Sequence, residues 1–521
     1  MELNLEQLIK RKEKAKAIKN KWRDHLKDCY KYSVPERETL DKKEEGAKKN
    51  IDVFDSTAII ATQKYANRMQ SQVVPPWKQW AMFKAGTEIP EEQHDDANKL
   101  LEKVGKIIFD NINHSNFDTQ IHEAFLDLAI STGALVVEAG DGITSTLNFR
   151  CISLSEIIPE KTSEGKICNV FREFTMPIRD VNEVWSTAKL SDNMAASLKR
   201  DEGSESDLVE CVYEYKTKQF EEKYRHVVFH EKDKHILLDE KLDSNPFIVF
   251  RETAIPNETI GRGRIMMLLP DIKTLNKVVE FNLRNAALAV SGIYTASDDG
   301  VINPYTLRLQ PGAIIPVGSN DQANPTLRPL DRSGDFNMAQ LIIQKYQETI
   351  NNVMFAQPFG QLSETPVRTA TEMGIRQEDL VQTSSSAFGR MQSELLEPLL
   401  KRVVDILKKQ GKIPDLRIDG KEVTIKFTSP MSRSQDVEEL QSLQQFMQMA
   451  QIIPPEQLQM EVKMEDIPKF IAEKVSLPMS LIRTKAEKVE MMQKAAQAAQ
   501  AMQQTQGTDQ SQQLLSTVAM S

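Results

Sequence analysis

The sequence of 521 residues lacks the marks of a secreted, disulfide-stabilised or membrane-spanning protein. Its four cysteines, Cys29, Cys151, Cys168 and Cys211, are widely spaced and form no CxxC pair. We therefore expect reduced and mostly buried thiols of an intracellular product. No apolar run reaches the roughly 18 residues that a transmembrane helix needs. The N-terminus also lacks the apolar segment of a signal peptide.

A surplus of positive charge is missing as well. The chain carries 66 Lys and Arg against 75 Asp and Glu, a formal net charge of −9. Proteins that grip nucleic acid need cations to neutralise phosphates, so this balance argues against a large basic DNA-binding face. It leaves open a protein past which nucleic acid slides without being held.

The common catalytic and metal-binding motifs are absent. The sequence has no GxxxxGK[ST] loop, no HExxH, no GxSxG and no EF-hand loop. His226, His230 and His235 are close in sequence, but no pattern of further ligands accompanies them, so structural histidines are favoured over a metal site. The segment from Gly261 to Arg264 is better explained as the approach to a following helix than as a phosphate contact. We predict no catalytic residue, metal or cofactor.

The most informative feature present is the segment from Thr369 to Lys409. Thr369 and Glu372 have capping-box spacing, and Gly411 follows as a plausible C-terminal cap. Together they predict one helix of about 41 residues, roughly 60 Å long. Because helices in globular proteins average about 11 or 12 residues, a helix of this length indicates a strut and an architectural protein. Its apolar or small stripe comprises Met373, Leu380, Ser384, Phe388, Met391, Leu395, Leu399, Val403 and Ile406.

Pro398 lies inside this predicted helix. A proline removes one backbone hydrogen bond and clashes with the preceding turn, which costs about 3 kcal/mol in a straight helix. We therefore predict a kink at Pro398. The alternative is two helices that join near Glu397, but the stripe keeps its phase across the proline.

Periodicity along the rest of the chain predicts an α+β protein that is predominantly helical. Apolar alternation makes residues 134–251 rich in strands, and a small β element is expected at 422–430. Residues 292–334 lose periodicity and gain Gly, Pro, Asn and Asp. The tail from 486 is rich in Gln, Met and Ala and is expected to form a marginal helix, a coiled coil with neighbours, or disorder. Helices are predicted at 4–32, 56–72 with Asp55 as cap, 92–115, 117–132, 178–196, 260–291, 335–355 and 434–450, with a further helical region to about 484.

Two long helices flanking an irregular insertion predict a stem with a tip. The helices at 260–291 and 335–355 would form the stem, and 292–334 the tip. Stem charges alternate in sign, so in a ring of copies they would line a channel that attracts nucleic acid only weakly. The loop 356–367 has one charge, Glu364, and no Lys or Arg. It is therefore suited to approach DNA without binding it tightly.

Three blocks of sequence resemble the portal, or head-to-tail connector, proteins of short-tailed podovirus-type bacteriophages. They are VFDSTAIIATQKYANRMQSQVVPPWKQWAMF at 53–83, STGALVVEAG at 131–140, and RTATEMGIRQEDL…RMQSELLEPLLKRVVDIL at 368–407. Their order and spacing also match, and the resemblance extends to about residue 485.

The resemblance implies a portal-type fold that assembles as a ring, usually of twelve subunits, around a central channel at one capsid vertex. Such rings act together with major capsid and scaffolding proteins, dock the terminase large subunit, and conduct double-stranded DNA during packaging and ejection. They later hold the tail adaptor and nozzle proteins. The implied protein is a virion component that assembles in the host cytoplasm, without catalysis, cofactor or membrane insertion.

The resemblance also assigns parts to the sequence. The implied regions are a wing at 1–259 that includes the β-rich part 134–251, stem helices at 260–291 and 335–355, a clip at 292–334, a tunnel loop at 356–367, a long kinked helix with a small β element at 368–430, a crown at 431–485, and a tail at 486–521 that forms a helical barrel or is disordered.

Candidate site residues follow from these parts. The tunnel loop would present Gln357, Phe359, Gln361, Ser363 and Glu364 to DNA. The channel-lining candidates of the stem are Lys273, Lys277, Glu280 and Arg284. The clip residues expected to contact terminase or adaptor are Tyr305, Leu307 and Arg308, and the helix kink is Pro398.

Two other functions remain as alternatives. An internal virion or scaffold-like structural protein would explain the helices, but the β-rich region and the 292–334 insertion count against it. An enzyme of DNA packaging is opposed by the missing nucleotide loop and the missing metal-binding carboxylates.

Overall fold

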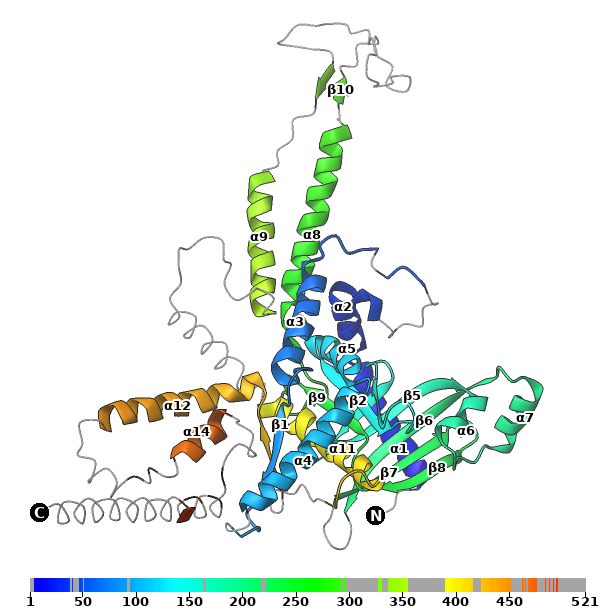
Figure 1. The fold of residues 1–521 in the computed structure, drawn as a ribbon. Coiled ribbons are helices and arrows are strands. Elements are labelled where there is room, and N and C mark those ends of the chain that lie inside the picture. Colours follow the sequence, from blue (N-terminus) through cyan, green and yellow to red (C-terminus); the bar gives the residue numbers. More distant parts are fainter. Residues whose placement is uncertain are drawn as a thin grey trace, which may run out of the picture. The chain divides into compact units, whose positions relative to one another are not determined.

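A computed structural model gives the fold (Figure 1). It describes residues 4–37, 40, 46–49, 51–90, 94–162, 165–216, 222–291, 294–296, 327–329, 336–354, 389–415, 423–450 and 467–475, with 462, 464, 483, 487, 491, 493 and 494. The chain divides into two compact units. Unit 1 comprises Met1–Met69, Thr119–Val136 and Arg150–Val367, and unit 2 comprises Gln70–Asp118, Val137–Phe149 and Arg368–Ser521. Helices and sheets are both present, so the predicted α+β class is confirmed.

A five-stranded antiparallel sheet dominates the β-rich part of unit 1 (Figure 1). Side chains alternate between the two faces of a strand. On β6 (Glu205–Lys216), Val209, Cys211 and Tyr213 therefore share a cluster with Leu8 and Ala15 of helix α1 (Leu5–Asn20). Leu208 faces the other way, into a cluster that includes residues of the short helices α6 (Val181–Val184) and α7 (Asp192–Arg200). The strands, in sheet order, are β4 (Ile157–Lys161), β5 (Ile167–Pro177), β6 (Glu205–Lys216), β7 (Glu222–His230) and β8 (His235–Leu242).

The single helix predicted at 4–32 is wrong, because the structure has two helices there. Helix α1 (Leu5–Asn20) ends at a turn formed by Lys21 and Trp22, and α2 (Arg23–Ser33) begins directly after it. Helix α1 buries Leu8 against the five-stranded sheet, whereas α2 packs against the long helix α8 (Arg264–Ser291). The two helices pack against different neighbours, and Ile18 near the end of α1 is 48% exposed.

The single helix predicted at 178–196 is also wrong. The structure has a 3₁₀ turn, η3 (Ile178–Asp180), with α6 (Val181–Val184), and then a separate helix, α7 (Asp192–Arg200). Trp185 is extended and ends the first part. Ser191 starts the second, because its hydroxyl accepts a hydrogen bond from the Met194 N–H at 3.2 Å. An N-cap serine inside a predicted helix is a start signal that the periodicity alone concealed.

Other predicted helices of the N-terminal half are confirmed. Helix α3 spans Thr57–Val73, and the Asp55 carboxylate accepts the Thr57 N–H at 2.9 Å, as expected of a cap. Helices α4 (His94–Asn113) and α5 (Phe117–Ile130) occupy the other two predicted ranges. After α5, β2 (Thr132–Ala139) lies between β3 (Leu147–Cys151) and β9 (Phe247–Arg251) in a three-stranded sheet.

The two long helices predicted at 260–291 and 335–355 are present as α8 and α9 (Phe336–Val353). They pack against each other within unit 1, as Figure 1 shows. Strands β10 (Tyr294–Ala296) and β11 (Leu327–Pro329) pair antiparallel between them in the sequence. The rest of the predicted clip and the whole of 356–367 lie outside the described residues.

Unit 2 pairs two segments that lie far apart in the sequence. Strand β1 (Ala81–Ala85) pairs antiparallel with β12 (Val423–Phe427), which confirms the predicted β element near 422–430. Helix α4 packs on β1, and Trp80 meets Phe109 of α4 edge to face at 5.0 Å. Helix α12 (Pro430–Ala450) packs against α14 (Ile467–Val475). No helix among the described residues combines the length and apolarity needed to cross a bilayer.

The described part of the predicted strut begins at Gly389, and its upstream part at 369–388 lies outside the described residues. From Gln392 to Leu396 the helix takes a π turn, η4, in which the Glu397 N–H bonds to the Gln392 carbonyl. Helix α11 (Glu397–Lys409) follows, with Pro398 in its first turn. A π turn rearranges the hydrogen bonds just where the proline has no N–H to donate. A bend at Pro398 stays a prediction.

The described residues of the apolar stripe predicted for 369–409 are buried, which confirms that part of the prediction. Met391, Leu395, Leu399 and Val403 are all fully buried. A second buried row, Leu396, Leu400, Val404 and Leu407, was not predicted. Because the two rows are offset by one residue, about 100° around the helix, they form one broad buried face of α11.

Three of the four cysteines should make the fold sensitive to alkali. Burial raises the pKa of Cys29 to about 12 and raises the pKa values of Cys151 and Cys211 further. In the unfolded chain these thiols ionise near pH 8.5, whereas the folded chain keeps them protonated. We expect the free energy of unfolding to fall above that pH by about 1.4 kcal/mol per pH unit per thiol. Urea unfolding between neutral and alkaline pH measures the slope.

The matched variant for this prediction is Cys29→Ala. It removes one of the three thiols, so the alkaline slope should become shallower by about 1.4 kcal/mol per pH unit. An unchanged slope in that variant would show that other groups cause the alkaline loss of stability.

Candidate functional site

The stem candidates are the predicted site residues that the structure describes, together with Pro398. Lys273, Lys277, Glu280 and Arg284 all lie on α8. The predicted tunnel-loop residues Gln357, Phe359, Gln361, Ser363 and Glu364, and the predicted clip residues Tyr305, Leu307 and Arg308, lie outside the described residues. The structure therefore brings together the charges of the stem and leaves the other assignments as predictions.

The charges on α8 are matched by carboxylates. Lys273 Nζ lies 2.6 Å from Asp28 Oδ2 of α2. Glu280 serves two cations, since its oxygens lie 2.8 Å from Lys277 Nζ and 2.5 Å from Arg284 Nη2. Hydrogen bonding from Lys277 and the nearby charge of Arg284 lower the pKa of Glu280. The three predicted channel-lining cations are thus each engaged by a carboxylate.

A buried joint fixes the base of the two stem helices. Arg264, the first residue of α8, donates to Glu252 Oε1 and to the carbonyl of Val353, the last residue of α9, both at 2.7 Å. Tyr65 of α3 donates to the other Glu252 oxygen at 2.8 Å, and its ring lies 5.6 Å from the Arg264 guanidinium. One arginine therefore connects the start of α8, the end of α9 and the loop after β9.

Residues 52–55, here called the strap, form hydrogen bonds with both stem helices at positions further along each helix from this joint. The buried Asn276 of α8 accepts the N–H groups of Phe54 and Asp55, at 2.7 and 3.3 Å, and donates to the Asp52 carbonyl at 3.0 Å. Gln347 of α9 donates to the Asp55 carboxylate at 3.0 Å. The same carboxylate caps α3, so the strap couples three helices.

Replacing Asn276 with Ala should release the strap. The change removes three hydrogen bonds and leaves strap backbone groups without their partner, which should cost about 1–3 kcal/mol. We expect faster hydrogen exchange at the Phe54 and Asp55 amides and a lower melting temperature. Gln347→Ala removes one bond from the same strap and should have a smaller effect. Unchanged exchange at Phe54 in Asn276→Ala would refute this role.

Apolar side chains are exposed on the parts of α8 and α9 that lie far along each helix from the joint. On α8, Phe281 is 52% and Leu283 54% exposed. On α9, Met338, Leu341 and Ile342 are also exposed and follow i, i+3, i+4 spacing. A helix that carries apolar residues on several sides is normally buried by neighbours.

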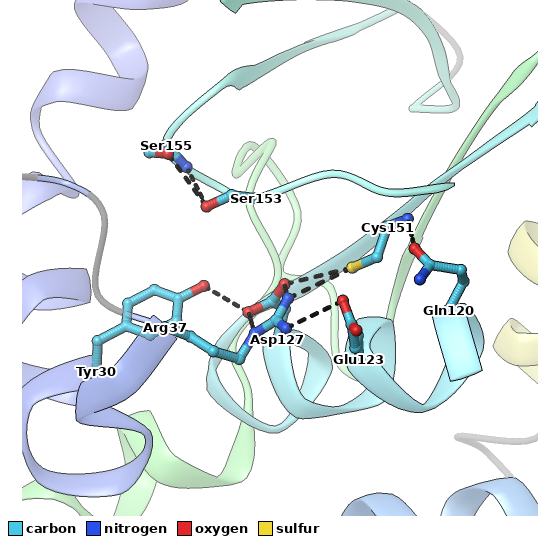
Figure 2. A network of polar contacts seen from close by, with 8 residues as sticks. All are labelled: Tyr30, Arg37, Gln120, Glu123, Asp127, Cys151, Ser153 and Ser155. Atoms are coloured by element: carbon cyan, nitrogen blue, oxygen red, sulfur yellow. Dashed lines mark hydrogen bonds and ion pairs between the residues drawn. The ribbon is translucent and has the colours of Figure 1, made fainter. Parts of the chain in front are cut away.

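A buried polar network fixes the helices that support the stem (Figure 2). Arg37 and Tyr30 converge on Asp127 of α5, which is 1% exposed. Arg37 Nη2 lies 2.8 Å from Asp127 Oδ2, and the Tyr30 hydroxyl donates to Oδ1 at 2.9 Å. Arg37 also contacts Glu123 at 3.3 Å and the Cys151 sulfur at 3.5 Å. The network joins α2, α5 and β3.

The ionisation of this network suits a structural role. Burial raises the pKa of Asp127, although Arg37 and Tyr30 offset part of that effect. Burial also raises the pKa of the Cys151 thiol, and a thiol that stays protonated is a poor nucleophile. The arrangement therefore holds segments together and offers no reactive group.

The histidines that lie close in sequence do not converge. His226 Nε2 lies 2.9 Å from Glu210, His230 Nδ1 lies 2.9 Å from Asp233, and His235 Nε2 lies 2.9 Å from the Lys189 carbonyl. In the part of the chain that the structure describes, no group of three or more His, Cys, Asp or Glu side chains is placed to hold a metal ion.

Periodicity did not identify the residues that position the stem. Arg264, Asn276 and Gln347 are ordinary polar residues of helical segments, and their partners lie far away in the sequence. Asp127 did carry a signal, because it is a lone acid within the apolar run AFLDLAI. A charge in such a run needs a buried partner.

Comparisons with known proteins agree on one family. Residues 5–482 match the model of the bacteriophage head to tail connecting protein family. The portal protein of Salmonella phage epsilon15 is 23% identical over 424 residues, 76% of this chain and 73% of that protein. The probable portal protein of Bordetella phage BPP-1 is 20% identical over 451 residues, 82% and 79% of the two chains.

Two further matches are more partial. The portal protein of Enterobacteria phage T3 is 23% identical over 201 residues, 38% of this chain and 37% of that protein. A chain from the virion of a native gene transfer agent particle aligns over 79% of this chain and 93% of its own length. Its TM-score is 0.33 at 10% identity, and no conclusion rests on that likeness.

Proposed function

The chain belongs to the family of bacteriophage head to tail connecting proteins and has the function of a phage portal protein, and on that premise we propose that its copies form a ring around a DNA channel. The ring has twelve subunits and occupies one vertex of the capsid. Double-stranded DNA passes through it during packaging and ejection.

The observation that carries the ring is the position of the exposed apolar residues on α8. Phe281 and Leu283 are two residues apart, which places them about 200° apart around a helix with 3.6 residues per turn. Each is more than half exposed in the single chain. A twofold dimer buries one such side, whereas a ring gives each subunit a neighbour on both sides. Exposure on opposite sides of α8 therefore favours a ring.

Finer assignments extend this proposal. Helices α8 and α9 form the stem, and residues 292–334 form the clip that meets the terminase large subunit and later the tail adaptor and nozzle. Residues 356–367 form the tunnel loop, 431–485 the crown, and 1–259 with 368–430 the wing. Capsid and scaffolding proteins contact the outside of the ring during assembly in the host cytoplasm. The support is the resemblance and the paired β10 and β11 strands between the stem helices.

Electron micrographs of the purified protein test the ring. Class averages should show particles with a central hole and rotational symmetry. Leu283→Glu should abolish them, because a charge would be buried at the contact between copies. Ile143→Glu is the matched control, since Ile143 lies in a loop outside the stem and is already 93% exposed. Wild-type monomers or filaments without a hole would overturn the proposal.

The tunnel-loop assignment predicts a separable defect. Deleting 356–367 should leave rings intact but reduce the yield of DNA-filled heads, because the loop would contact DNA and not neighbouring stems. Counting full and empty heads in micrographs of infected-cell lysates measures the effect. A normal yield of full heads from the deleted chain would remove the assignment.

A further inference from the structure

The charge cluster on α8 is built around one carboxylate. Glu280 is only 7% exposed, although it lies on a helix whose neighbouring positions are open. Lys277 is three residues before it and Arg284 four residues after it, so both lie on the same side of the helix. Their side chains are 56% and 68% exposed. The anion is therefore covered, while the cations it holds remain near solvent.

Exposed cations are the groups that bind DNA phosphates. Each Lys or Arg that neutralises a phosphate releases counterions and strengthens binding at low salt. Lys277 and Arg284 would both be able to do this if no carboxylate engaged them. A salt bridge to Glu280 replaces that interaction with an internal one. Lys277 is additionally held 5.0 Å from the centre of the Phe281 ring.

We propose that Glu280 is a positioning residue that engages Lys277 and Arg284 and so prevents the stem from gripping the phosphates of passing duplex DNA. This inference rests on the proposed function, because it requires α8 to face the channel. A conduit must let DNA move in both directions, and a row of free cations repeated around a ring would resist that movement.

The size of the effect follows from the number of cations released. Each additional phosphate contact steepens the dependence of log affinity on log salt by about 0.9 for duplex DNA. Loss of Glu280 frees two cations in each subunit that faces the duplex. We therefore expect a slope steeper by about 1.8 for each such subunit.

The test titrates assembled rings into a short linear DNA duplex and measures DNA binding by fluorescence anisotropy. The titration is repeated over a range of NaCl concentrations. Glu280→Gln should bind at least about ten-fold more tightly than wild type at low salt, with a steeper salt slope. Glu348→Gln is the matched control. It makes the same change of charge at an exposed position of α9 and leaves the Glu280 cluster intact. We expect it to stay within about two-fold of wild type.

A third variant separates released cations from a general loss of structure. Combining Glu280→Gln with Lys277→Gln and Arg284→Gln removes the freed cations, so weak DNA binding should return. If Glu280→Gln does not assemble, Glu280→Asp replaces it, since the shorter side chain keeps the charge but cannot hold both cations.

The outcomes distinguish this inference from the ring itself. Normal rings in which Glu280→Gln and Glu348→Gln bind DNA equally would overturn the role of Glu280 and leave the portal architecture untouched. Wild-type protein without a central hole would overturn the architecture, and this inference with it.

Discussion

Replacing Arg37 with Met is expected to destabilise unit 1 by about 3–5 kcal/mol, because it leaves a buried carboxylate without its cation. Asp127 is almost completely buried and receives two contacts from the Arg37 guanidinium, at 2.8 and 3.3 Å. The Tyr30 hydroxyl alone cannot balance the charge. Urea unfolding measures the loss of stability, and hydrogen exchange at the amides of α5 and β3 locates it.

The pH dependence gives a second readout of the same variant. Without Arg37, Asp127 escapes the penalty by taking up a proton. The destabilisation should therefore shrink as pH falls. Combining Arg37→Met with Asp127→Asn should recover part of the stability, since no buried charge then remains. An Arg37→Met variant with wild-type stability at neutral pH would show that the pair contributes nothing to the fold.

A surface pair provides the control. Lys106 and Glu102 form an ion pair at 3.1 Å on α4, with the lysine side chain 55% exposed. Lys106→Met should change stability by no more than about 1 kcal/mol, because water screens exposed pairs. The contrast isolates burial as the cause.

Replacing Gly263 with Ala is expected to cost about 3 kcal/mol or more, since the added methyl group would meet backbone atoms that cannot move aside. A Cβ at this position would lie 2.3 Å from the Ala129 carbonyl oxygen and 2.4 Å from the Ile130 carbonyl carbon. The Gly263 N–H also donates to the Ile130 carbonyl at 3.1 Å. The start of α8 is thereby pressed against the end of α5.

The control for this substitution is Gly389→Ala. A Cβ there meets nothing within 4 Å, and the residue is helical, so the change should stabilise by up to about 1 kcal/mol. Thermal unfolding and the yield of infectious phage from complemented cells measure both variants. Wild-type stability in Gly263→Ala would mean that α8 can start elsewhere.

Local signals were sufficient for much of the secondary structure. Asp55 marked the start of α3, and the alternating charges of the stem were recognised, although the pairing of Glu280 with Lys277 and Arg284 was not predicted. The breaks at Trp22 and Ser191 were missed, because the apolar pattern continued through them. Tertiary packing determined those breaks, since α1 and α2 have different neighbours.

The supports of the stem could not have been read from the sequence. Arg264 meets Val353 across 89 residues, and Asn276 meets the strap across more than 220. Such contacts depend on how the chain folds back on itself, and periodicity contains no information on that. The second buried row of α11 was missed for the same reason, because α11 packs against α4, which comes from a distant part of the sequence.

The π turn between Gln392 and Leu396 has a consequence for insertions and deletions. A π bulge accommodates one residue more than an α-helix of the same rise, and one residue corresponds to about 100° of rotation about the axis. Deleting a single residue within Gln392–Leu396 would therefore restore a regular helix and leave the turn at Gly389–Met391 in phase with α11, whereas the same deletion within α11 would rotate one side by about 100°. Met391, which is fully buried, would keep its place in the core only in the first case. The π turn thus marks the position where this helix can lose one residue, and single-residue deletions in natural variants should fall there.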